Sequence, residues 1–159
     1  MRDLSASEQA ALSARKSQFG PFYAELIPAL VEFMDRLGIT PAHAVLTDAP
    51  AFAPLLATVL RNQHLENAAD RVWLLTRVGY YVGEYLVQRH GGCWFVNDAA
   101  KSASFARFVV GQFATLGGVS ARVDPFAVAA DYVDDLPGAD LAALLGEIDV
   151  ALDGVAGRA

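Results

Sequence analysis

Residues 65–89 form a long stretch without proline, and within it residues 72–87 are apolar on nearly every side of a helix. Thr76, Arg77 and Glu84 interrupt this apolar surface. A helix that is apolar all round is stable when its neighbours cover it. We therefore expect a long, buried central helix, ended by Gly91-Gly92, with the rest of the chain packed around it.

Capping and proline signals predict two helices before this segment. A capping box at Ser5 begins a helix of 6–18, which Gly20-Pro21 should end. The same proline suits the first turn of a second helix, which should kink at Pro28 and end at Gly38. Its apolar residues recur at helical spacing: Phe22, Leu26, Leu30, Phe33 and Leu37.

Similar signals divide the rest of the chain. Thr40-Pro41 and Asp48 with Pro50 predict a short turn and then a helix. Asp124-Pro125 is a cap followed by a first-turn proline, and Pro137-Gly138 separates the helix it begins from a last one opened by Asp140. The expected ranges are 50–61, 125–134 and a segment from 140 whose apolar face holds Leu141, Leu144, Leu145, Ile148 and Leu152.

The strands should follow the central helix. The aromatic and β-branched run 93–96 predicts one strand. Residues 105–113 fit a helix or a strand; we favour a strand, because Gly117-Gly118 and the run 119–123 then supply a turn and a third strand. The sequence thus predicts an α+β fold: a mainly helical single domain over residues 1–159, with a small antiparallel sheet of two or three strands after the long central helix.

Charge and composition narrow the class of partner. The 159 residues carry a net charge of −6 and have a pI near 4.9. Nucleic-acid binding needs clustered Lys and Arg, so we expect no nucleic-acid partner, and a partner steered by charge should be basic. A single cysteine and a polar N-terminal segment predict a cytoplasmic protein. The most apolar window, 42–60, contains two prolines, so we expect no membrane segment.

Patterns for metal binding and catalysis are weak. His90 and Cys93 are suitable ligand types, but the other histidines lie in different expected segments, so we expect no metal site. No serine lies in a G-x-S-x-G motif, and an apolar strand should bury the Cys93 thiol and keep it unreactive. No glycine-rich nucleotide motif follows a strand, so we expect no cofactor and assign no catalytic residue.

Three acidic residues gather near the end of the expected 125–134 helix: Asp131, Asp134 and Asp135. The helix dipole disfavours negative charge there, so some compensation is expected. We consider two interpretations: a solvated acidic helix end, which we favour, and a contact face for a cation or a basic protein partner.

Glu84 raises a sharper question, because it lies among large apolar residues. On a helix it shares a side with Arg77, Tyr80 and Tyr81. A buried carboxylate needs hydrogen-bond donors or water. The tyrosine hydroxyls, the Trp94 indole and the amides of the glycine turn are available. Either Glu84 ties the central helix to the strand that follows, which we favour, or these residues line a polar cleft.

The same segment resembles a pattern found in small bacterial proteins of unknown function. The matching runs are Y-x-G-E from Tyr81, G-G-x-W from Gly91 and D-P-F from Asp124, within roughly residues 73–132. The resemblance implies an α+β domain and the role of an immunity protein, which binds and neutralises a toxin. It brings no assigned catalytic residue.

These observations predict a non-enzymatic, cytoplasmic protein-binding module, immunity-like in role, whose acidic surface meets a protein partner. The alternative is a small-molecule-binding protein or enzyme that uses a cleft around Glu84. A homodimer is a third option, because so apolar a chain can expose a patch that a second copy covers.

Overall fold

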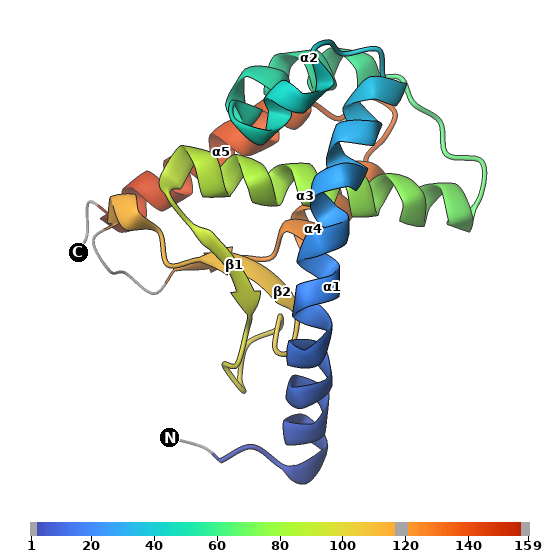
Figure 1. Ribbon diagram of the computed structural model, residues 1–159. Coiled ribbons are helices and arrows are strands. Elements are labelled where there is room, and N and C mark those ends of the chain that lie inside the picture. Colours follow the sequence, from blue (N-terminus) through green and yellow to red (C-terminus); the bar gives the residue numbers. More distant parts are fainter. Residues whose placement is uncertain (1–2, 117–120, 157–159) are drawn as a thin grey trace.

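The computed structural model describes residues 3–116 and 121–156. It shows a mainly helical α+β fold with a three-stranded antiparallel sheet after the long central helix, as the sequence predicts (Figure 1). With η for 3₁₀-helices, the elements in chain order are α1 (Ala6–Arg36), η1 (Ala42–Leu46), η2 (Ala49–Phe52), α2 (Ala53–Leu60), α3 (Ala68–His90), β1 (Cys93–Val96), β2 (Phe108–Gly111), η3 (Ala114–Leu116), β3 (Arg122–Val123), α4 (Pro125–Asp134) and α5 (Leu141–Ala156).

Helix α3 is the centre of the molecule. Every residue from 78 to 86 is buried. Figure 1 shows α1 crossing α3, with α2 on one side of it and the sheet on the other. Helix α4 packs along α3, and α5 packs against α2. The buried central helix is therefore confirmed. Across residues 3–116 and 121–156, no helix combines the length and the apolarity that crossing a membrane requires.

Helix α1 corrects one prediction. It runs without a break from Ala6 to Arg36, so the expected end at Gly20-Pro21 is wrong. An interior proline costs a helix about 3 kcal/mol. Packing outweighs this cost, because Phe19, Phe22 and Leu26 continue one apolar face across the proline. Both phenylalanine rings contact Phe108 of the sheet, and Leu26 lies in the core.

The helix starts expected at Asp124 and Asp140 are confirmed, whereas the segment expected as one helix over 50–61 is divided. The segment after Pro41 forms η1, η2 and α2 in place of one turn and one helix. Helix α4 spans the expected 125–134, and the Asp124 side chain accepts hydrogen bonds from the first free amides of that helix, at Phe126 and Ala127. Asp140 accepts one from the amide of Ala143 in the same way at the start of α5.

The sheet has the strand order β1-β2-β3, with both pairs antiparallel. Trp94 pairs with Val110, and Val110 in turn pairs with Val123. The strand interpretation of 105–113 is therefore confirmed for 108–111. The expected turn at Gly117-Gly118 and the first two residues of the 119–123 run lie outside the described residues, and β3 covers Arg122–Val123.

Candidate functional site

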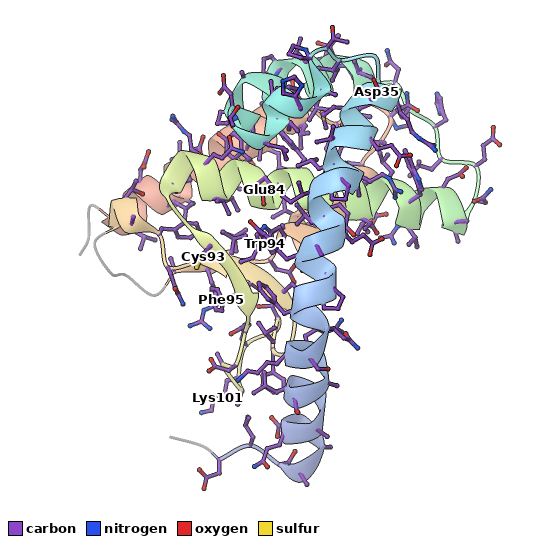
Figure 2. The ribbon with its side chains drawn as sticks, in the orientation of Figure 1. Asp35, Glu84, Cys93, Trp94, Phe95 and Lys101 are labelled. Atoms are coloured by element: carbon purple, nitrogen blue, oxygen red, sulfur yellow. The ribbon has the colours of Figure 1, made fainter. Side chains whose placement is uncertain are left out.

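Glu84 points from the middle of α3 toward β1, where Trp94 lies (Figure 2). It is 5% exposed, and the Trp94 Nε1–H donates a hydrogen bond of 3.2 Å to its Oε1 atom. Burial raises the pKa of the Glu84 carboxyl, and the hydrogen bond from Trp94 opposes part of that rise. The carboxyl group thus joins the central helix to the first strand from inside the core.

The other residues considered with Glu84 have partners elsewhere. The Tyr81 hydroxyl donates to the Ala49 carbonyl oxygen at 2.8 Å. Arg77 lies over the ring of Trp73, with its guanidinium carbon 4.2 Å from the ring centre. It also donates a hydrogen bond to the backbone carbonyl oxygen of Trp73. The structure therefore brings Glu84 together with Trp94, while Arg77 and Tyr81 contact other parts of the molecule.

Two glycines explain the sequence pattern around Glu84. A Cβ atom at Gly83 would lie 1.8 Å from the Trp94 ring, and one at Gly79 would lie 2.4 Å from the Phe126 ring. The absent side chains leave room for both rings against α3. The Y-x-G-E, G-G-x-W and D-P-F runs thus meet as one packing unit, in which α3 accommodates an aromatic ring from β1 and another from α4.

The three acidic residues near the end of α4 separate into two groups. Asp134 accepts hydrogen bonds of 2.7 and 3.0 Å from Arg71, and this contact lowers the pKa of the Asp134 carboxyl. Asp131 and Asp135 instead line a groove of about 290 Å³ between α4 and α5. The compensation expected at this helix end therefore reaches Asp134 through Arg71.

We name this groove the acidic groove. Its carboxylates come from Asp131, Asp135, Asp140 and Glu147. Tyr132 also lines it and is 2% exposed, and its hydroxyl is buried without a hydrogen-bond partner in the described part of the chain. Burial and the charge of Asp140 raise the pKa of Tyr132 to about 12.

Sequence reasoning missed three members of the acidic groove, which are Tyr132, Asp140 and Glu147. The spacing of the carboxylates was the available signal, because the four groove carboxylates recur every four to seven positions from Asp131 to Glu147. That signal crosses a helix break at Pro137, so the geometry of the connection decides whether the two helices face one another.

The helix end at His90 and the strand start at Cys93 do not form a site together. His90 is buried, with its Nε2 atom 2.7 Å from Asp149 Oδ1 on α5, and Tyr85 donates to the same carboxylate at 2.5 Å. Cys93 is exposed, so its expected burial is wrong. Side chains alternate along a strand, and Trp94 takes the inward position.

Within residues 3–116 and 121–156, no group of three or more His, Cys, Asp or Glu side chains could hold a metal ion. Comparisons of the chain with sequence profiles of known protein families, with curated proteins and with solved structures find no match.

Proposed function

We propose that this protein is a non-enzymatic, cytoplasmic protein-binding module, immunity-like in role, whose acidic groove receives a basic side chain of its partner. The observation that carries the proposal is a groove rimmed by four carboxylates, in whose wall Tyr132 keeps a buried hydroxyl without a partner in the described chain. A buried polar group without a partner costs free energy, so a role in binding is a reason to keep it. A lone cysteine at the surface suits a cytoplasmic setting.

The chemistry of the acidic groove favours arginine as the inserted side chain. A guanidinium group presents five N–H donors in a flat fork, which match carboxylate oxygens two at a time. Arg61 pairs with Asp140 at 3.3 Å, and the three other carboxylates still leave the groove an excess of negative charge. The net charge of −6 acts in the same direction, because it attracts a basic partner from a distance.

The geometry gives less support to an enzyme centred on Glu84. A general acid or base must reach its substrate, and Glu84 is enclosed by the core and bound to Trp94. An acid-base role would require an opening of the helix–sheet interface. Binding at the exposed carboxylates of the acidic groove, which are Asp131, Asp135 and Glu147, requires no such change.

A pull-down with matched variants tests the proposal. The tagged protein captures its partner from native lysate, and mass spectrometry identifies it. Asp131→Asn/Asp135→Asn should reduce capture at least tenfold, because each charged hydrogen bond lost is worth about 1.5–3 kcal/mol. The control, Asp35→Asn/Asp98→Asn, removes the same charge at two exposed positions and should capture normally. Equal capture by both pairs, an acidic partner, or recovery of this chain alone would refute the proposal.

A further inference from the structure

A second pocket lies where α1, α3, α4 and the start of β2 meet. It shares no lining residue with the acidic groove. We call it the aromatic pocket; its volume is about 270 Å³. Three half-buried phenylalanines form its apolar wall, which are Phe22, Phe108 and Phe126. Phe22 and Phe108 are stacked with their ring centres 4.0 Å apart, and Phe126 meets Phe22 edge-on at 6.1 Å.

The rest of the aromatic pocket is polar and positively charged. Arg15 and Arg107 supply two guanidinium groups, and Thr76 and Tyr80 each contribute a hydroxyl. An apolar wall with a few convergent polar groups is typical of sites that bind small molecules. Tyr80, one of the residues first considered with Glu84, therefore lines this pocket.

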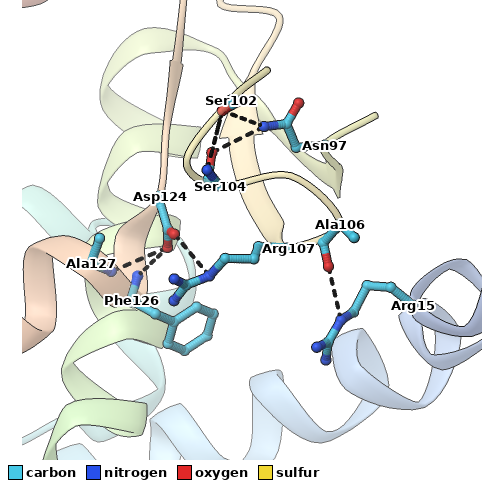
Figure 3. Close-up of polar contacts among 9 residues, drawn as sticks. All are labelled: Arg15, Asn97, Ser102, Ser104, Ala106, Arg107, Asp124, Phe126 and Ala127. Atoms are coloured by element: carbon cyan, nitrogen blue, oxygen red, sulfur yellow. Dashed lines mark hydrogen bonds and ion pairs between the residues drawn. The ribbon is translucent and has the colours of Figure 1, made fainter. Parts of the chain in front are cut away.

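Each arginine makes a polar contact with the protein through its Nε atom, as Figure 3 shows. Arg107 Nε lies 3.1 Å from Asp124 Oδ2, and Arg15 Nε donates to the Ala106 carbonyl at 3.0 Å. Because these contacts use Nε, the terminal nitrogens of Arg107 can donate to a ligand. Arg15 also spans part of the wall, with its guanidinium carbon 5.3 Å from the Phe108 ring centre.

The loop of residues 97–107, which ends at Arg107, is fixed by hydrogen bonds within itself. The buried Asn97 side chain donates to the hydroxyls of Ser102 and Ser104, at 3.0 Å each, and its backbone pairs with Ala106 and Arg107 (Figure 3). Ala106 has a φ of 57°, a left-handed conformation that is uncommon for alanine. Such strain persists where surrounding contacts enforce it, and it clusters at binding sites.

The charges at the aromatic pocket select the ligand class. The formal charges of the two arginines and Asp124 add up to +1. The nearby charges of Glu25 and Arg77 shift the pKa of Tyr80 in opposite directions, so they add no clear excess of either sign. A single positive charge suits a monoanion better than a phosphate dianion. We propose that the aromatic pocket binds a small aromatic monocarboxylate, with its ring against the phenylalanines and its carboxylate on Arg15 and Arg107. The flat carboxylate matches the guanidinium fork.

An NMR titration of the ¹⁵N-labelled protein tests this assignment. The probes are phenylacetate and its neutral counterpart phenylacetamide. Phenylacetate should cause saturable shifts centred on the amides of Arg15, Phe108 and Phe126, and phenylacetamide should bind at least tenfold more weakly because it lacks the charge. Arg15→Gln and Arg107→Gln should each weaken phenylacetate binding about tenfold. Arg36→Gln, an exposed arginine of the same helix as Arg15, should leave the affinity within twofold.

Three results would overturn the proposal. The first is no saturable shift with phenylacetate up to about 10 mM, which is about tenfold above a Kd of 1 mM. The others are equal affinity for acid and amide, and an equal loss of affinity in Arg36→Gln. Circular dichroism checks that each variant folds. If Arg107→Gln fails to fold because Asp124 loses its ion pair, the affinity of Arg15→Gln for phenylacetate decides whether the proposal stands.

Discussion

Glu84 acts as a hydrogen-bond acceptor in the core. Its partner, the Trp94 indole N–H, is a donor that would otherwise be buried without an acceptor. A glutamine offers the same oxygen as an uncharged group, so the structural task at this position does not depend on a charge. Burial nevertheless penalises the carboxylate form, which is why the pKa of Glu84 is raised.

We predict different outcomes for two substitutions of Glu84. Glu84→Ala should lower the free energy of unfolding by about 1–3 kcal/mol, because the indole N–H loses its acceptor. Glu84→Gln should cost little at pH 7, since it keeps the acceptor and removes a disfavoured charge. Urea denaturation of both variants measures this. A loss in Glu84→Gln as large as in Glu84→Ala would show that the charge itself stabilises the fold.

The raised pKa of Glu84 also predicts a pH dependence. Below the unfolded carboxyl pKa of 4.5 both states hold the proton, so there is no penalty. As pH rises above this value, the unfolded state releases the proton first, and the folded state loses stability until its own, higher pKa is passed. The wild type should therefore lose stability over this window relative to Glu84→Gln. Parallel unfolding curves at pH 4 to 8 would contradict it.

At the scale of single residues, the sequence predicted that the Glu84 carboxyl needs a hydrogen-bond donor and offered several candidates. The structure shows which of them binds it, the Trp94 indole N–H. Helical spacing places Arg77, Tyr80 and Tyr81 on one side with Glu84, but a side of a helix is wide. The positions of η2, Trp73 and β1 decide where each side chain finds its partner, and these depend on long-range packing.

Helix α3 is shaped to receive rings from other elements. Gly79 and Gly83 are one helical turn apart, and they face Phe126 on α4 and Trp94 on β1. Glycine weakens a helix by about 1 kcal/mol relative to alanine, so two of them in a central helix need a compensating contact. The close approach of the two rings provides it.

A pair of glycine substitutions separates packing from helix propensity. Gly83→Ala should destabilise the protein by about 3 kcal/mol or more, because its methyl group would overlap the Trp94 ring. Gly20→Ala in α1 has no atom within 4 Å of the new methyl group and should stabilise the protein by about 0.5–1 kcal/mol. Thermal unfolding of both proteins measures the difference. A mild effect at Gly83 would mean that Trp94 can move aside.

Element starts were predictable where a local signal is strong. The Asp124 cap fixed α4, and glycines ended α3, because both act within one turn of chain. The break expected at Gly20-Pro21 was wrong since it weighed a local cost and ignored an apolar face that continues from Leu12 to Phe33. Tertiary packing overrides a local breaker of this size.

Over the whole molecule, the two candidate sites assemble over different distances along the chain: the aromatic pocket joins residues from Arg15 to Phe126, and the acidic groove lies within residues 131–147. Arg15 reaches Ala106 across 91 positions, and the acidic groove forms across a helix break. Neither arrangement has a short sequence motif. The fold class, by contrast, follows from the spacing of apolar residues and from the caps, glycines and prolines that end each element. These signals can be read directly from the sequence.

The arrangement also predicts a gradient of local stability. The first half of α1 projects away from the body in Figure 1, and within 6–18 Leu12 is the sole buried residue. Residues 78–86 of α3 are buried throughout. Regions with little buried apolar contact open with low free energy, while the core opens on global unfolding.

Hydrogen exchange followed by mass spectrometry measures this gradient. Amides of residues 8–18 should exchange at least about a hundredfold faster than those of 78–86, because opening the end of α1 exposes little apolar surface. Arg15→Gln should speed exchange in residues 8–18 further and leave α3 unchanged, since the contact with Ala106 ties this end to the sheet side of the molecule. Arg36→Gln, at the other end of α1, is the control. Equal protection along the whole of α1 would show that the helix is stabilised as one unit despite its exposed end.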